Sequence, residues 1–197
     1  VEITAIADSI QSRLDGTSKA EGNISGQAEG GVTGLNATKY LDGMELINNA
    51  DIDIVDICVG TDLHFVFVEA ALAKGKHVLV EKPLARTFDE AKKIVQLAEG
   101  SESYVMSAMC LRYWPAWVYL KEAIQTNQFG KCLSLNCKRQ TSFPGGAFYS
   151  DHHQCGGALL DLHVHDTDFI NYCLGLPDAV FSQGYVGPSG GIDHIVT

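Results

Sequence analysis

Three side chains in this sequence have the types and the spacing needed to move a proton: Lys82, Asp161 and His165. Lys82 stands between Glu81 and Pro83, and a proline disfavours helical geometry in the residue before it and can follow a cis bond. Asp161 and His165 are four positions apart, so a helix would place both on one face. A carboxylate beside an imidazole orients the ring and supports its protonated form, and a crevice lysine with a lowered pKa can exchange a proton. By spacing alone, a solvated surface lysine and a surface Asp–His pair are the commoner explanations.

The elements that position these residues are predicted to alternate between strand and helix. Each predicted strand is apolar throughout, as in a parallel sheet whose two faces are both covered by helices. Strands that alternate with helices of about 11 residues indicate βαβ crossovers, so the predicted fold class is α/β with a doubly wound parallel sheet. Thr87 is predicted to cap the helix that follows it. The predicted strands are residues 1–7, 53–59, 77–80 and 104–109, and the predicted helices are residues 63–74 and 87–99.

The pattern changes near Pro115, where we place a domain boundary. Beyond it, a segment in which apolar and polar residues alternate is typical of a half-exposed strand in a different sheet. A long amphipathic segment that carries Asp161 and His165 is predicted to be one helix. These elements are a helix at about residues 116–127, a strand at 131–141 and a helix at 158–174. The sequence therefore divides into a first domain at residues 1–114 and the start of a second domain at 115–197.

A dinucleotide-binding (Rossmann) domain usually begins with a strand, a G-x-G-x-x-G loop and a helix N-terminus, and this sequence contains no such motif. Either the first domain does not bind a nucleotide, or the chain begins at the second strand of a Rossmann domain, with a short helix and a loop in residues 9–36. Asp8 favours the second interpretation, because an acidic strand end is where such a domain binds the adenosine ribose; a turn or cap residue is the alternative. A carboxylate here favours NAD, whereas the nearby Arg13 keeps NADP open. We therefore expect the native polypeptide to be longer at both ends.

Composition and charge argue against several classes of function. The 197 residues carry 24 acidic and 14 basic side chains, and the formal net charge of −10 argues against nucleic acid or an anionic membrane as the main partner. No apolar run reaches about 18 residues, the length of a membrane span, and the N-terminus lacks the features of a signal peptide. Six scattered cysteines without a C-x-x-C pair predict buried thiols in a reducing cytoplasm. We predict no metal site, because no standard zinc spacing fits the cluster of His152, His153, Cys155, Asp161, His163 and His165.

Two stretches of the sequence resemble the signatures of the glucose–fructose oxidoreductase / inositol dehydrogenase (Gfo/Idh/MocA) family. The first, DIVDICVGTDLHFVFVEAALAKGKHVLVEKPLA at residues 53–85, joins a strand, a Thr-x-x-His turn, a helix ending in Gly-Lys-His, a strand and Glu-Lys-Pro. The second is GGALLDLHVHDTDFINYCLG at residues 156–175, and the two occur in the family's order. The resemblance implies a Rossmann domain, here without its first strand, and part of an α/β domain with an open, mostly antiparallel sheet. That sheet often forms the subunit interface in relatives, so we expect a homo-oligomer.

The resemblance also implies roles for individual residues. The catalytic residues would be Lys82, Asp161 and His165, and these three would contact the substrate together with Tyr113 and His163. The cofactor, in addition to Asp8 and Arg13, would contact Thr61, Asp62, His64, Glu81, Lys82, Pro83 and Arg112. A helix cap is the alternative role for Thr61 or Asp62. Two positions depart from the family pattern: Cys110 stands where relatives often carry a cofactor-contacting Asn, and His163 stands where a small residue is usual.

The activity implied by this resemblance is NAD(P)-dependent transfer of hydride between nicotinamide and a secondary hydroxyl of a sugar, inositol or related polyol. Lys82 and His165 would handle the proton, and Asp161 would orient His165. Two alternatives stay open. One is a family member that recycles bound nicotinamide to cleave glycosides, and the other is a truncated, non-catalytic binding or regulatory protein, which the absent Gly-rich loop favours.

Overall fold

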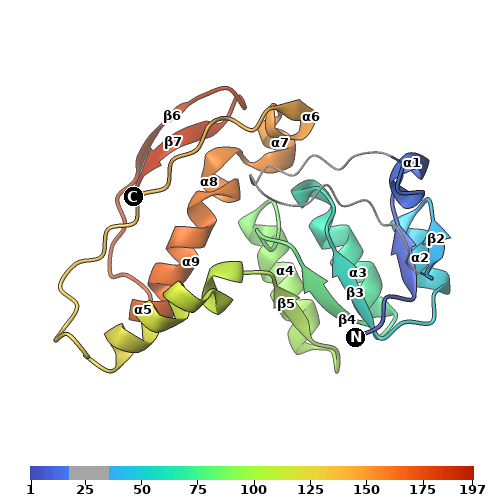
Figure 1. The fold of residues 1–197 in the computed structure, drawn as a ribbon, viewed down its shortest axis with the longest axis horizontal. Helices are drawn as coiled ribbons and strands as arrows, with labels where there is room; N and C mark the ends of the chain where they lie inside the picture. The colour runs from blue at the N-terminus through green and yellow to red at the C-terminus, as the bar shows by residue number, and fades with distance from the viewer. Residues whose placement is uncertain (18–35) are drawn as a thin grey trace.

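The computed structural model describes residues 1–17 and 36–197, which form two groups of elements (Figure 1). The first group comprises β1 (Ala5–Ala7), α1 (Gln11–Leu14), β2 (Thr38–Tyr40), α2 (Gly43–Asn49), β3 (Ile54–Ile57), the 3-10 helix η1 (Thr61–Leu63), α3 (His64–Ala73), β4 (His77–Val80), α4 (Phe88–Glu99) and β5 (Val105–Ser107). The second comprises η2 (Cys110–Tyr113), α5 (Pro115–Gln125), α6 (Gly146–Tyr149), α7 (His152–Cys155), α8 (Gly157–Asp161), α9 (His163–Leu174), β6 (Gln183–Val186) and β7 (Ile192–Val196). Most of the loop predicted in residues 9–36 lies outside the described residues.

The strands of the first group pair in parallel, as the sequence predicts. β3, β4 and β5 form one sheet in that order, with Ile54 opposite His77 and Val78 opposite Val105. β1 pairs with β2 in parallel, with Ala5 opposite Thr38. The carboxyl ends of β3, β4 and β5 therefore meet at one edge, and Lys82 lies two residues after the end of β4 at that edge.

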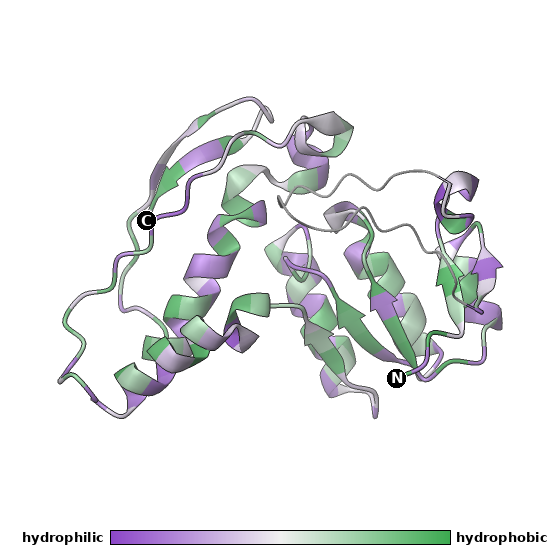
Figure 2. Ribbon diagram, viewed as in Figure 1, coloured by the Kyte–Doolittle hydropathy of each residue, from purple (hydrophilic) through white to green (hydrophobic). Residues whose placement is uncertain are grey.

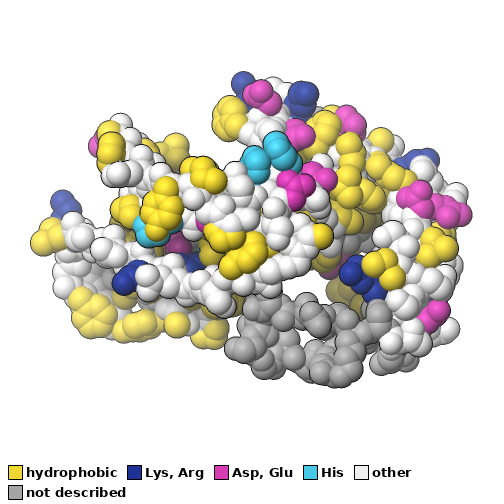
Figure 3. Space-filling view, turned by 90° about the horizontal axis from the view of Figure 1, so that it is seen from above, with side chains coloured by type: hydrophobic (Ala, Val, Ile, Leu, Met, Phe, Trp, Pro, Cys, Tyr) yellow, Lys and Arg dark blue, Asp and Glu magenta, His cyan; other side chains and the backbone are white. Residues whose placement is uncertain are grey.

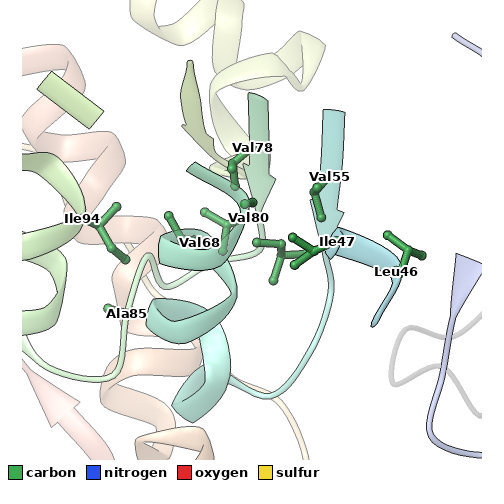
Figure 4. Packing of buried hydrophobic residues seen from close by; sticks show 10 residues of the cluster. Leu46, Ile47, Val55, Val68, Val78, Val80, Ala85 and Ile94 are labelled. Atoms are coloured by element: carbon green, nitrogen blue, oxygen red, sulfur yellow. The ribbon is translucent and has the colours of Figure 1, made fainter. Parts of the chain in front are cut away.

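The core of the first group lies between α3 and the parallel sheet (Figure 4). Val68 of α3 and Val80 of β4 are fully buried, and Ile47 of α2 and Ile94 of α4 are each 1% exposed. Burying a side chain of this size stabilises a fold by roughly 1.5–3 kcal/mol relative to leaving it in water. Strands β3 and β4 are mostly hydrophobic along their length (Figure 2), but the prediction that helices cover both faces is wrong for β3 among the described residues: Val55 and Ile57 are buried, whereas Ile54 is 53% exposed. This core fixes the strand ends from which the chemically interesting loops start.

The predicted helix boundaries are confirmed most closely where capping is strong. Thr87 caps α4 through a capping box, in which its side chain accepts from the amide of Glu90 while the Glu90 carboxylate accepts from the amide of Thr87. β2 and α2 were missed. The cue for α2 was Asp42, whose carboxylate accepts from the amide of Met44 at 2.7 Å and caps the helix.

The strand predicted at residues 131–141 is wrong, because this segment has no regular secondary structure. Alternation predicts which side chains share a face, but a strand also needs a neighbouring backbone to bond. Among the described residues, none pairs with this segment, and Leu133 is 89% exposed.

The single helix predicted at residues 158–174 is two helices, α8 and α9, which meet at Leu162. The two pack against different partners, since α8 contacts β7 whereas α9 contacts α5 and η2. β6 and β7 form an antiparallel pair, with Gln183 opposite Val196. None of the described helices is long and apolar enough to cross a membrane.

Candidate active site

A cleft of about 960 Å³ lies between the carboxyl ends of β4 and β5 and the second group of elements. This volume is within the usual range of ligand-binding clefts, and the position matches where open α/β sheets bind ligands. The polar and charged side chains at the cleft come from both groups of elements: Glu81, Lys82, Tyr113, Arg139, Gln140, Thr141, Ser142, Tyr149, Asp161 and His165. The three residues predicted to be catalytic therefore line one cleft.

Lys82 contacts Asp161 directly across this cleft. Its Nζ donates to Oδ1 of Asp161 at 2.8 Å and to the carbonyl oxygen of Asp161 at 2.9 Å. Both side chains are about 20% exposed, so the ion pair is largely shielded from water. The backbone amide of Lys82 donates to the carboxylate of Glu81 at 3.0 Å, and the Lys82–Pro83 bond is cis. The sequence predicts Asp161 as a partner of His165. The structure shows that Asp161 also contacts Lys82, which the positions of the two residues in the sequence do not predict.

His165 lines the same cleft, and its Nδ1 is buried without a hydrogen-bond partner among the described residues. Burial, followed by the positive charges of Lys82 and Arg139, lowers the pKa of His165 below its ordinary value of 6.5. Asp161 and Asp166 oppose this shift. The imidazole is therefore neutral at neutral pH and can accept a proton.

Arg139 and Asp166 form a second ion pair beside His165, which the sequence did not predict. Nε and Nη2 of Arg139 donate to the two carboxylate oxygens of Asp166 at 3.1 and 3.0 Å. Asp166 is only 6% exposed, and a buried carboxylate requires a partner of this kind. An available cue was the aspartate next to His165, but its partner is 27 residues away in the sequence.

Arg112, predicted to contact the cofactor, forms an ion pair with Asp168. Its guanidinium donates to both carboxylate oxygens of Asp168, with Nε 2.9 Å from Oδ2, and lies over the ring of Tyr172 at 4.4 Å. Both partners belong to α9, so this contact ties η2 to the helix that carries His165. Tyr113 lines the cleft, as predicted for a substrate contact, and so does Cys110.

The turn after β3 was predicted to contact the cofactor, and its side chains differ in their placement. Thr61 is 5% exposed and Asp62 is exposed, and neither makes a side-chain cap at η1 or α3. His64 is 1% exposed, with Nδ1 2.8 Å from the carbonyl oxygen of Pro83 and Nε2 3.2 Å from that of Val59. The His64 ring therefore contacts the protein backbone rather than the cleft.

Asp8, Arg13 and His163 are not among the residues that line the cleft. Asp8 follows β1, accepts from the amide of Ile10 at 2.8 Å, and lies 3.5 Å from Nη1 of Arg13. His163 contacts Oγ1 of Thr197 through Nε2 at 2.9 Å. His163, which the sequence predicts to contact the substrate, does not line the cleft in this structure.

Within the described residues, one group of possible metal ligands lies close together, and it is outside the cleft. Ligand atoms of Asp151, His152 and His153 are all within 4.8 Å of one another. The carboxylate of Asp151 caps α7, accepting from the amide of His153 at 2.9 Å and from Nε2 of Gln154 at 3.0 Å. This group does not include Cys155, Asp161, His163 or His165 from the cluster considered in the sequence.

Comparison with known proteins identifies the family. Residues 2–109 match the GFO/IDH/MocA model described as an oxidoreductase family with an NAD-binding Rossmann fold, and residues 117–197 match the GFO/IDH/MocA C-terminal domain. The chain belongs to the GFO/IDH/MocA family. The family and the α/β fold predicted from the two sequence signatures are therefore confirmed, and so is the NAD-binding nature of the first fold unit.

Relatives in the GFO/IDH/MocA family include inositol dehydrogenases. The chain is 28% identical over 164 residues to myo-inositol 2-dehydrogenase of Thermotoga maritima, covering 80% of this chain and 48% of that one. It is 33% identical over 138 residues to inositol 2-dehydrogenase of Burkholderia multivorans, covering 69% and 39%. The chain thus spans about half the length, or less, of these curated relatives.

Two solved structures of similar fold extend this comparison. An oxidoreductase from Thermotoga maritima superposes with a TM-score of 0.78 at 25% identity, covering 98% of this chain and 58% of that one. Levoglucosan dehydrogenase, solved in complex with NADH and levoglucosan, gives a TM-score of 0.70 at 26% identity, covering 82% and 48%.

Proposed function

We propose that this protein is an oxidoreductase that transfers hydride between a nicotinamide dinucleotide and a secondary hydroxyl of a sugar, inositol or related polyol. The observation that carries the proposal is the meeting of Lys82, Asp161 and His165 in one cleft at the carboxyl edge of a parallel sheet. The names of the relatives, inositol 2-dehydrogenase and levoglucosan dehydrogenase, favour polyols and sugars as the substrate class.

The residues present fit a nicotinamide cofactor. The cleft opens at the ends of β4 and β5, and its volume of about 960 Å³ can take a nicotinamide ring together with a sugar-sized substrate. We propose that Thr61, Asp62, Glu81, Lys82, Pro83 and Arg112 hold the nicotinamide half, and that Asp8 and Arg13 hold the adenosine half. The carboxylate of Asp8 favours NAD, and Arg13 beside it keeps NADP open.

Oxidation of a secondary alcohol removes a hydride from carbon and a proton from the hydroxyl, and the carbon–oxygen bond becomes a carbonyl. The chemistry that a bound nicotinamide supplies is acceptance of the hydride. His165, neutral because its pKa is lowered, accepts the hydroxyl proton. Lys82 donates a hydrogen bond to the same oxygen and stabilises the negative charge that develops on it, while Asp161 holds the ammonium group in place.

Substrate hydroxyls beyond the reacting one need polar partners. Gln140, Thr141 and Ser142 line the same cleft and supply amide and hydroxyl groups, which can donate or accept hydrogen bonds. We propose that these side chains bind the remaining hydroxyls, together with Tyr113.

The test is oxidation of a panel of polyols, including myo-inositol, with NAD⁺ or NADP⁺, followed by the absorbance of the reduced nicotinamide. We expect Lys82→Met and His165→Asn to lower turnover by about 100-fold or more, since each removes a proton-handling group. Binding of NADH should be retained in His165→Asn, because His165 is not among the proposed cofactor contacts. Lys92→Met, at an exposed position on α4, is the matched control. Normal rates in both site variants would contradict the assignment, and turnover without net NADH release would favour glycoside cleavage instead.

We further propose that the protein is a cytoplasmic homo-oligomer that associates through its C-terminal sheet. Exposed hydrophobic side chains lie over the C-terminal half, on the left in Figure 3, and β6 and β7 expose Tyr185, Val186 and Val196 by 63–65%. All six cysteines are free, which fits a reducing compartment, but only Cys155 is buried, so the prediction of buried thiols is wrong for the other five. The oligomeric state is measured by sedimentation, and a monomer at micromolar concentration would contradict this association.

A further inference from the structure

We propose that His64 is a positioning residue for Lys82, acting through the two strand-end loops that it joins. The proposal rests on the function proposed above, in which Lys82 contacts the reacting hydroxyl. His64 begins α3 and does not line the cleft, so it acts on the chemistry only through the backbone that it holds.

The His64 ring joins the loop after β3 to the loop after β4. Its Nδ1 is 2.8 Å from the carbonyl oxygen of Pro83, and its Nε2 is 3.2 Å from the carbonyl oxygen of Val59. Both carbonyls only accept, and a neutral ring carries one N–H, so we assign that proton to Nδ1, which makes the shorter contact, with Pro83. At 1% exposure the ring excludes water, so no solvent molecule replaces it at the Pro83 carbonyl.

These contacts fix the backbone on both sides of Lys82. On one side, the amide of Lys82 donates to the carboxylate of Glu81, and the amide of Glu81 donates to the carbonyl of Ile57 in β3 at 3.0 Å. On the other side, the next residue, Pro83, is held by His64. The direction of the Lys82 side chain toward Asp161 is therefore set by a short backbone segment with an anchor at each end.

A small displacement of this backbone segment is sufficient to lower the rate of the reaction. Catalytic groups act efficiently only within a narrow range of positions, and a misplacement of about 1 Å can lower a rate by about 100-fold. Loss of the Pro83 anchor would leave the backbone around Lys82 held only on its Glu81 side. We therefore expect His64 to influence kcat far more than the affinity for substrate or cofactor.

Two variants of His64 separate its two contacts. The side-chain NH₂ of asparagine occupies a position close to Nδ1 and can still donate to Pro83, whereas that of glutamine lies closer to Nε2 and reaches Val59 instead. We expect His64→Asn to keep kcat near that of the unmodified protein. We expect His64→Gln to lower kcat by about 10- to 100-fold, with KM for the polyol and Kd for NADH almost unchanged. Equal kcat in the two variants would overturn the proposal, because a merely structural role would not distinguish them.

Hydrogen–deuterium exchange gives a readout that does not require turnover. The peptide spanning residues 81–86 should exchange faster in His64→Gln than in His64→Asn, while a peptide from α5 serves as the unchanged reference. If no polyol is oxidised by the unmodified protein, the proposed function fails, and this contrast still decides whether His64 holds the loop. Equal protection of the 81–86 peptide in both variants would overturn the proposal.

A measurement on the unmodified protein covers the case in which a variant does not fold. The ¹⁵N chemical shifts of the His64 ring report which nitrogen carries the proton. The geometry requires a proton on Nδ1, facing Pro83. A ring protonated on Nε2 alone would overturn the proposal.

Discussion

Nζ of Lys82 lies 2.8 Å from Oδ1 of Asp161, although the two residues are 79 positions apart and belong to different groups of elements. The contact brings the loop after β4 to the end of α8, and both residues line the cleft. The two sequence signatures that resemble the Gfo/Idh/MocA family thus meet physically at this ion pair.

The strength of this pair can be measured by a double-mutant cycle with Lys82→Met and Asp161→Asn. Each single change leaves one largely shielded charge without its partner, so we expect the double variant to be more stable than the sum of the two single effects predicts. The coupling should be roughly 0.5–3 kcal/mol, measured as the free energy of unfolding in urea. A coupling of zero would show that the contact does not form in solution.

Replacing Arg139 should change the pH dependence of turnover. The positive charge of Arg139 helps to lower the pKa of His165, so Arg139→Met should raise that pKa. His165 would then stay protonated up to a higher pH, and the acid limb of the plot of kcat against pH should shift to higher pH. The neighbouring exposed Lys138→Met is the control. A downward shift, or the same shift in both variants, would argue against this role of Arg139.

The capping box of α4 provides a stability prediction separate from the chemistry. Thr87→Ala removes the side-chain acceptor for the amide of Glu90 and should destabilise the protein by about 1 kcal/mol. Thr87→Ser keeps the hydroxyl and should retain most of the stability. Thermal unfolding of the three proteins tests this, and turnover should be the same in all of them.

The thiol of Cys58 should react slowly with alkylating reagents, although this residue is exposed. Burial of the sulfur, the charge and hydrogen bond of Asp56, and the charge of Glu81 raise the pKa of Cys58 to about 12. Little thiolate then exists at neutral pH, and the thiolate is the reactive form. We expect Asp56→Asn to speed alkylation of Cys58, measured by mass spectrometry, whereas Asp53→Asn should not. Equal rates in both variants would contradict the influence of Asp56.

Local sequence patterns predicted the parallel sheet and the placement of Lys82 well. β3 and β4 are continuous apolar runs, and the Glu-Lys-Pro segment follows β4 at once, so its position depends on short-range order. The capping box at Thr87 is equally local, and its prediction succeeded for the same reason.

These local patterns could not predict contacts between residues that are far apart in the sequence. Asp166 is buried, so it needs a cationic partner, but nothing in the spacing selects Arg139. The alternation in residues 131–141 predicts a strand, but the segment has no sheet partner among the described residues, and Arg139 is held by its ion pair with Asp166. His64 was predicted as a cofactor contact from its place in a signature, whereas burial directs its ring to two backbone carbonyls.

The interruption at Leu162 has a consequence for how the ammonium group of Lys82 is held. In a continuous helix the amide of residue 165 would bond the carbonyl of residue 161. Here the amide of His165 turns to the carbonyl of Leu162 at 3.2 Å, and the carbonyl of Asp161 accepts from Lys82 at 2.9 Å. Asp161 therefore accepts two hydrogen bonds from the same ammonium group, one through its main-chain carbonyl oxygen and one through a side-chain carboxylate oxygen. One of these two acceptors is a backbone carbonyl, so a substitution that changes only the side chain at position 161 leaves one of the two hydrogen bonds to Lys82 in place.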